Sequence, residues 1–298
     1  MLIVIIPGYK RWGGVFALSG VGATMVISFY FLGAPDLALT QTAVELVSLG
    51  LLASVLLLLG RSRKEVVEES TTRLGLILRI LGALAGAVAA FVASVWALLP
   101  GPDRSAAFFY GEHTLRSGGG ANAVNVVVVD FRGFDTFGEI AVLGGAAIGF
   151  FLVLGFLKQK KWIQVSTSPQ WRPSPWRFQT LAPWMALAFV LALFITFRGH
   201  NEPGGGFVGG LTAAMVLLTV SYFDGRRRDL PGFGWIGLGF AVAWVSTLVP
   251  ALWGDGVFRS YVISGFATST FFDLGLATLV AGSTLALVNE WKQLWERE

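Results

Sequence analysis

Residues 12–60 read WGGVFALSGVGATMVISFYFLGAPDLALTQTAVELVSLGLLASVLLLLG and contain two long apolar stretches separated by a short turn. A bilayer core about 30 Å thick is crossed by roughly 20 apolar residues in an α-helix. The stretches 12–32 and 38–60 each have that length. Gly33-Ala-Pro-Asp36 between them can form a tight turn in which Asp36 caps the second helix. The segment therefore predicts a hairpin of two membrane-spanning helices.

Six further apolar stretches of similar length follow along the chain. They are continuously apolar and do not alternate, which disfavours a β-barrel. We therefore expect an all-α polytopic membrane protein with about eight transmembrane helices in two four-helix halves. The six later helices are expected at 74–99, 137–157, 178–197, 207–223, 232–253 and 268–289.

The composition of the 298 residues agrees with a membrane protein, because 54% are hydrophobic and only 13% are charged. Soluble domains contain about 25% charged residues. The absence of cysteine and the presence of only two histidines exclude iron–sulfur and cysteine-zinc sites, so no cofactor is expected. The sequence also contains no Walker loop and no nucleophile–base arrangement. These absences disfavour an ATP-driven pump or a hydrolase and predict a protein that is not an enzyme.

The positive charges predict the orientation of the helices in the membrane. When eight helices are placed as above, sixteen of the 22 Lys and Arg residues lie on one side and five on the other, with Arg79 inside the third helix. The more basic side faces the cytoplasm, so both termini are expected there and the protein is expected in the cell inner (plasma) membrane. The net charge of +4 therefore reflects basic loops and does not indicate nucleic-acid binding.

A basic stretch with three Trp residues, KQKKWIQVSTSPQWRPSPWR (158–177), divides the chain. It predicts a cytoplasmic linker between membrane domains at 1–157 and 178–298. The two halves show no internal repeat, so an inverted-repeat transporter is not expected. The apolar run 124–129 is too short to cross a bilayer and is compatible with a re-entrant or interfacial helix.

Carboxylates inside apolar helices are the main functional candidates, because ionisable groups in a membrane are costly and usually face a water-filled path. Glu45 lies near the middle of the second helix with Gln41 on the same face. Asp135 and Glu139 share one face at the start of the fourth helix, where they could attract a cation or a proton. The alternatives are a neutral, hydrogen-bonded Glu45 and helix capping by Asp135.

Each of four other ionisable residues can have either a functional or a structural role. Arg79 can be a counter-charge to these acids or can extend towards the cytoplasm. Asp273 in the last helix can face the path or cap the helix. His200 can relay protons or bond the glycine-rich loop at 198–207, whose glycines permit close backbone approach. Asp130 is expected to form a salt bridge with Arg132.

The stretches GAPDLALTQTAVELVSL (33–49) and VNVVVVDFRGFDTFGEIAVL (124–143) resemble the C-terminal region of the large A-type subunit of Mrp-type multisubunit Na⁺/H⁺ antiporters. The stretches FRGHNEPGGGFVGGL (197–211) and FFDLGLATLVAG (271–282) resemble the B-type subunit of the same family. The resemblance extends to subunits of membrane-bound hydrogenases, which are distant relatives of respiratory complex I. It covers nearly the whole chain and implies the tail of an A-type subunit fused to a B-type subunit.

The resemblance implies a role in Na⁺ and H⁺ translocation, with Glu45, Asp135 and Glu139 in the ion path, where Na⁺ could bind. Asp36, Arg79, Asp273 and His200 are further candidates for this path. The large antiporter-like domains of the A-type subunit are absent from the sequence. Partner subunits of a membrane complex are therefore expected to complete the antiporter. Two alternatives are an ion-translocating subunit of a membrane-bound hydrogenase or other complex I-like enzyme, and a scaffold that docks partner subunits.

Overall fold

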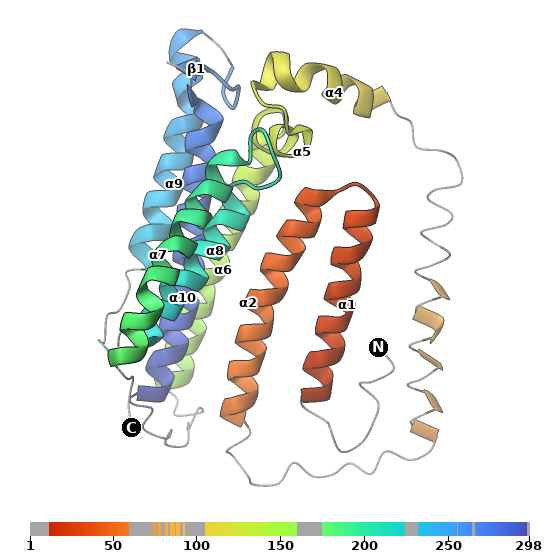
Figure 1. Ribbon diagram of the computed structural model, residues 1–298, viewed down its shortest axis with the longest axis vertical. Coiled ribbons are helices and arrows are strands. Elements are labelled where there is room, and N and C mark those ends of the chain that lie inside the picture. Colours follow the sequence, from red (N-terminus) through yellow and green to blue (C-terminus); the bar gives the residue numbers. More distant parts are fainter. Residues whose placement is uncertain are drawn as a thin grey trace.

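The computed structural model describes residues 12–59, 105–159, 175–223 and 232–296 except 255, 264 and 265, together with scattered helical positions between 74 and 92. This part of the chain is mostly helical, as expected (Figure 1). A small antiparallel hairpin of two-residue strands, β1 (Val262–Ile263) and β2 (Phe266–Ala267), precedes the last helix.

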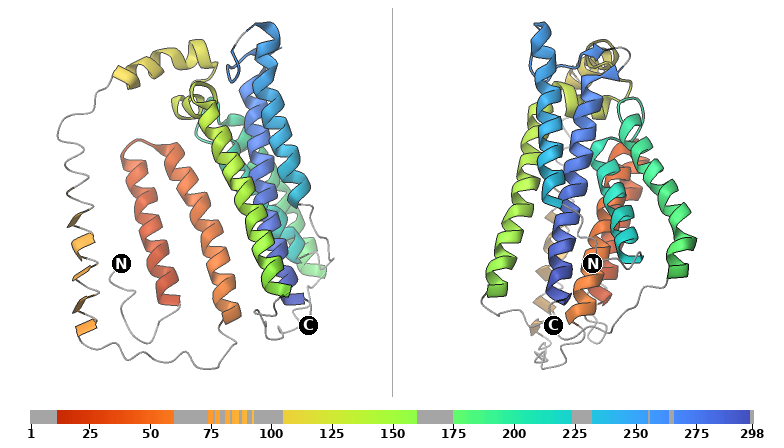
Figure 2. Two further views of the ribbon diagram at one scale, coloured as in Figure 1. Left: turned by 180° about the vertical axis from the view of Figure 1, so that it is seen from behind. Right: turned by 90° about the vertical axis from the view of Figure 1, so that its left-hand side faces the viewer.

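The first two helices form the predicted hairpin. Helix α1 (Trp12–Phe31) is followed by a turn and then by α2 (Pro35–Leu59). Gly33 has a φ angle of 74°, which favours glycine in this turn, and proline is well suited to the first position of α2. The hairpin lies beside the other helices, and α2 contacts α8 (Figures 1 and 2).

Residues 105–132 lie at one end of the bundle (Figure 1). Helix α4 (Ser105–Gly118) crosses this end, which we call the α4 end (Figure 1). The apolar run 124–129 then forms the short helix α5 (Ala123–Val126) and the π-helical turn η2 (Val127–Phe131). Helix α6 (Gly133–Gln159) follows directly, so the run leads straight into the start of α6.

The described part of the second half contains four long helices, of which α10 contacts the other three. They are α7 (Pro175–Arg198), α8 (Gly206–Phe223), α9 (Gly232–Leu248) with its 3₁₀ extension η3 (Val249–Trp253), and α10 (Thr268–Glu296). Helix α10 contacts α6, α7, α8 and α9 (Figure 2). Its backbone approaches α9 closely, because a Cβ added at Gly275 would lie 2.6 Å from the amide nitrogen of Ala243. Small residues at such contacts allow apolar helices to pack tightly.

Four helical stretches among the described residues are long and apolar enough to cross a membrane. They are Gly133–Val153, Gln179–Arg198, Gly232–Trp253 and Thr268–Leu287, and two shorter apolar helices cover Leu18–Phe31 and Gly206–Val220. These helices identify a multi-pass membrane protein. About two thirds of the α10 stretch is buried within the chain, so α10 forms the centre of the bundle.

Candidate functional site

A cavity of about 270 Å³ lies between α2, α6, α8 and α10, near the α4 end, and we call it the polar cavity because its otherwise mostly apolar lining contains carboxylates. Three carboxylates line it, and each comes from a different helix: Asp36 from α2, Glu139 from α6 and Asp273 from α10. The hydroxyl-bearing residues Thr40 and Thr136 also line the cavity. Carboxylate and hydroxyl oxygens can accept protons or surround a hard cation, so this cavity is the candidate functional site.

Asp36 holds one wall of the cavity through contacts with both halves of the chain. Its side chain is buried, and its Oδ1 accepts hydrogen bonds from Asn122 Nδ2 and from the Gly204 amide, each at 3.1 Å. Asn122 Nδ2 also donates to the carbonyl oxygens of Gly199 and Glu202. The residue expected as a helix cap therefore joins α2 to the segment before α5 and to the glycine-rich loop.

Asp273 holds the opposite wall in a similar way. Its two carboxylate oxygens accept hydrogen bonds at 3.0 Å, one from Asn125 Nδ2 and one from the Gly206 amide. Gly205 has a φ angle of 105°, and a Cβ there would lie 2.8 Å from Asn125 Oδ1. The glycine-rich loop thus provides the close backbone approach that the sequence predicted, and Asp273 belongs to the cavity wall.

Asp135 and Glu139 have different surroundings although they start the same helix. Asp135 is exposed and forms an ion pair with Arg132, whose Nε donates to Asp135 Oδ2 at 2.7 Å. Glu139 is also exposed in the isolated chain, and it lines the cavity beside Thr136. Of the two predicted acids on α6, Glu139 therefore lines the cavity, whereas Asp135 forms an ion pair with the Arg132 side chain.

Glu45 lies between the two helices of the hairpin and does not line this cavity. Gln41 Nε2 donates to Glu45 Oε1 at 2.9 Å, which confirms that the two side chains share a face. The carboxyl group lies over Gly22 of α1, where an added Cβ would overlap it. Within the described residues no group of three or more His, Asp or Glu side chains is placed so as to hold a metal ion.

The predicted salt bridge between Asp130 and Arg132 is wrong. Arg132 pairs with Asp135, whereas the buried side chain of Asp130 lies 3.6 Å from His200 Nε2. Asp130 belongs to the π-helical turn η2, and its side chain is directed into the protein. His200 is buried and its ring contacts the Gly118 carbonyl oxygen and Ser269 Oγ. Arg79, the other predicted candidate, lies outside the described residues.

Two asparagines that organise the cavity were not predicted from the sequence. Asn122 and Asn125 are both buried, and each binds a carboxylate of a distant helix. Asn122 lies just before the run 124–129 and Asn125 lies inside it. This position was the available signal, because a buried amide requires hydrogen-bonding partners.

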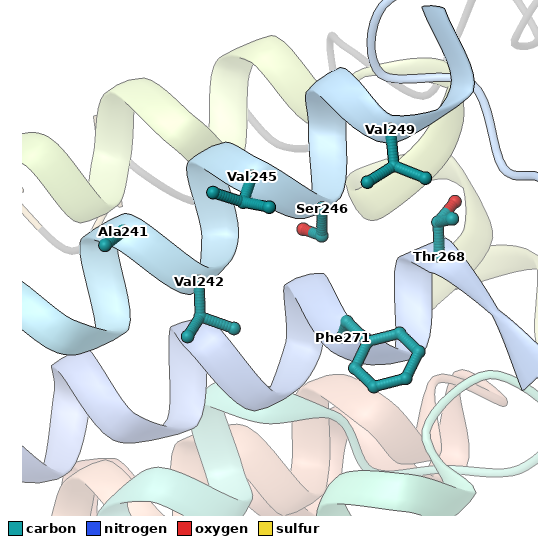
Figure 3. A pocket seen from close by; sticks show the side chains of 7 residues that line it. All are labelled: Ala241, Val242, Val245, Ser246, Val249, Thr268 and Phe271. Carbon is teal, nitrogen blue, oxygen red and sulfur yellow. The ribbon is translucent and has the colours of Figure 1, made fainter. Parts of the chain in front are cut away.

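A second pocket, of about 370 Å³, lies between α9 and α10 and has a different character (Figure 3). In this view Val242 and Val245 of α9 and Val249 of η3 line the pocket together with Thr268 and Phe271 of α10. Its lining contains no ionisable side chain. This pocket therefore offers no group that could exchange a proton or bind a cation strongly.

Three family models match successive parts of the chain. Residues 1–61 match the MbhD subunit of MBH, residues 76–166 match the MbhE subunit of MBH, and residues 178–286 match a domain related to the MnhB subunit of Na⁺/H⁺ antiporters. Among curated proteins, a probable A/B subunit of a K⁺/H⁺ antiporter from Rhizobium meliloti is 31% identical over 94% of this chain. The A subunit of a Na⁺/H⁺ antiporter from Bacillus subtilis is 36% identical over 49% of it.

This chain spans about a third of the length of the A/B relative (32%) and 18% of the Bacillus protein. Among solved structures, the Mrp complex from Dietzia sp. DQ12-45-1b matches 97% of this chain and 33% of its own chain, with a TM-score of 0.75 and 28% identity. An archaeal membrane-bound sulfane sulfur reductase shares the fold over 72% of this chain and 98% of its own, with a TM-score of 0.57 and 24% identity. Both halves of the chain are therefore similar to subunits of Mrp-type antiporters, in the order of a C-terminal A-type region followed by a B-type domain.

Proposed function

We propose that this chain is a subunit of an Mrp-type cation/H⁺ antiporter complex and forms part of its sodium and proton path. The observation that carries the proposal is the polar cavity, in which Asp36, Glu139 and Asp273 meet from three helices. Carboxylates within a membrane are costly unless they serve a path or a partner. The matches to antiporter subunits along both halves of the chain support the same conclusion.

The proposal includes a topology and a division of the chain. We infer eight transmembrane helices with both termini in the cytoplasm, because this arrangement places most basic residues on the cytoplasmic side. The A-tail-like domain then covers residues 1–157 and the B-like domain residues 178–298, joined by a cytoplasmic linker. In this orientation the α4 end faces the outside of the cell inner (plasma) membrane. The chain works with other subunits and has no enzymatic activity of its own.

Glu139 and Glu45 have separate roles in this proposal. Glu139 is exposed in the isolated chain and lines the cavity, so it can exchange ions between the cavity and a neighbouring protein of the complex. Glu45 is partly buried over Gly22 and bound by Gln41, and it supplies a second carboxylate nearer the middle of the membrane. Asp135 is held by Arg132, and its place in the path depends on release from that ion pair.

The experiment uses the assembled complex in everted membrane vesicles, where cation-dependent proton movement is followed with a pH-sensitive dye. We expect Glu45→Gln and Glu139→Gln each to abolish cation-dependent exchange while the complex still co-purifies. Glu112→Gln is the matched control, because Glu112 is an exposed acid on α4. Full exchange in the Glu45→Gln/Glu139→Gln double variant would overturn the ion-path role and would favour a scaffold role.

The same vesicles distinguish the transported cation. The expectation from the sequence is sodium, and the relative from Rhizobium meliloti, named as part of a probable K⁺/H⁺ antiporter, favours potassium as the second candidate. We expect exchange when Na⁺ is added. Exchange with K⁺ and none with Na⁺ would support the antiporter function and identify K⁺ as the transported cation.

A second candidate function is favoured by the two family models described as subunits of MBH. In that case the same helices would translocate ions in a redox-driven membrane complex. Because this chain has no cysteine, iron–sulfur clusters would have to be carried by other subunits. Purification of the complex from its own membranes tests this alternative: co-purifying iron–sulfur proteins would support the redox complex, and their absence would support the antiporter.

A further inference from the structure

A buried cluster of four polar side chains lies at the α4 end, apart from the lining of the polar cavity. It contains Asp130 of η2, His200 of the glycine-rich loop, Ser260 before β1, and Ser269 of α10. The side chains of Asp130 and His200 are only 5% and 6% exposed, and Asp130 Oδ2 lies 3.6 Å from His200 Nε2. The cluster therefore joins a titratable acid of the first half to a titratable base of the second half.

The hydrogen bonds of this cluster have a definite direction. His200 Nε2 lies 2.9 Å from the Gly118 carbonyl oxygen, and a carbonyl can only accept, so Nε2 carries the hydrogen. Ser269 Oγ lies 3.1 Å from the same nitrogen and 3.1 Å from Ser260 Oγ. The Ser260 hydroxyl donates to the carboxyl group of Asp130. Two hydroxyls therefore connect the imidazole to the carboxylate.

Two atoms of the cluster are buried without a hydrogen-bond partner: His200 Nδ1 and Asp130 Oδ2. In the tautomer given above, Nδ1 holds a lone pair that can accept a proton. A buried carboxylate oxygen without a donor is unfavourable while it is charged, and protonation removes that cost. Both ends of the hydroxyl chain can thus take up a proton.

The charged groups around the cluster favour protonation of Asp130. Burial, and then the nearby negative charge of Asp273 on α10, raise the pKa of Asp130 to about 8, and the Ser260 hydrogen bond acts in the opposite direction. The backbone at the end of α4 packs closely against the cluster. A Cβ added at Gly118 would overlap Val126, and one added at Gly120, just after α4, would overlap His200. The titratable groups that face the cluster are therefore Asp130, His200 and Asp273, and Arg259, which is exposed, lies next to Ser260.

We propose that Asp130, His200, Ser260 and Ser269 form a proton-binding relay that joins the two halves of the chain. A proton binds to His200 Nδ1, and the Nε2 proton moves to Ser269 Oγ. Ser269 passes its own hydroxyl proton to Ser260, and Ser260 passes its proton to Asp130. The imidazole ends neutral with its hydrogen on Nδ1, both serines keep one hydrogen each, and Asp130 gains the proton. This relay rests on the proposed function for its use in transport, but proton binding itself does not depend on it.

The test measures protonation directly, without transport. The chain has two histidines, so His113→Gln in the assembled complex leaves His200 as the only histidine of this chain. Selective labelling of this chain with ¹⁵N-histidine then reports which ring nitrogen carries hydrogen at each pH. We expect the ring-nitrogen signals of His200 to respond to the protonation of Asp130. Asp130→Asn should remove both the carboxylic-acid infrared band and this response.

Ser269→Ala separates the relay from a merely structural contact, because it breaks the hydroxyl chain and leaves both titratable groups in place. We expect it to uncouple the His200 change from the Asp130 band while the complex stays assembled. Titrations in Ser269→Ala that match those of the parent would overturn the relay.

A second measurement uses stability against pH. Since the pKa of Asp130 is raised from 3.8 to about 8, its contribution to stability is complete at pH below 4 and is lost as the pH rises to 8. Asp130→Asn should remove this part of the pH dependence of the Tm, and Glu112→Gln should not. An unchanged profile in Asp130→Asn would overturn the proposal. Failure of the transport assay with intact titrations would instead reject only the proposed function.

Discussion

The carboxylates of this protein fall into two groups with different surroundings. Asp36 and Asp273 are buried, and each accepts hydrogen bonds from an asparagine and from a backbone amide of the glycine-rich loop. Glu45 and Glu139 are more accessible, and Glu45 has the hydrogen bond from Gln41. The first group is built to hold the two halves together. The second group retains freedom to exchange a proton or a cation.

The largest effect is expected from a change in the buried group. Asp273→Ala leaves the Asn125 amide and the Gly206 N–H without their acceptor, at about 1–3 kcal/mol for each donor. We therefore expect a marked loss of folded protein and a lower Tm in detergent. Glu112→Ala, which removes an exposed acid from α4, should leave both quantities unchanged. Equal stability of the two variants would mean that the buried acids contribute little to holding the halves together.

The sequence was sufficient to predict the long apolar helices of the described residues, because the thickness of a bilayer determines how long an apolar run must be. It did not predict α4 (Ser105–Gly118). The predicted ranges 12–32 and 207–223 differ from α1 and α8 by a single residue at one end. The pairing of Asp36 with Asn122 and Gly204 could not be predicted in the same way. Those residues are 86 and 168 positions away, and apolar helices give no periodic pattern that identifies an inward face.

Asp130 shows a second limit of sequence reasoning. Its distance of two residues from Arg132 suggested a local salt bridge. In the structure Asp130 lies in the π-helical turn Val127–Phe131 and its side chain lies against His200. Such turns are rare and have no clear sequence signature. The functional importance of Glu45 and Glu139 remains a prediction, whereas their positions are now defined.

An intermediate effect is expected where α1 contacts Glu45. A Cβ at Gly22 would overlap the Glu45 carboxyl group, which is the end of a flexible side chain and can move away. Gly22→Ala should therefore change stability by no more than about 0.5 kcal/mol but should reduce cation-dependent exchange several-fold. Gly20→Ala is the matched control on the same helix, because nothing lies within 4 Å of its added Cβ. Equal exchange rates in the Gly22→Ala and Gly20→Ala variants would show that Glu45 is not part of the ion path.

The smallest effect is expected at Arg132, which tests whether Asp135 belongs with the accessible group. The side chains of Arg132 and Asp135 are 64% and 51% exposed, so solvent screens their ion pair and its contribution to stability is below about 1 kcal/mol. Arg132→Gln should thus leave the Tm nearly unchanged at any salt concentration. If the ion pair withholds Asp135 from the path, the variant should alter the apparent cation affinity measured in vesicles. An unchanged affinity would place Asp135 outside the path and would leave Glu139 as the acid of α6 that meets the ion.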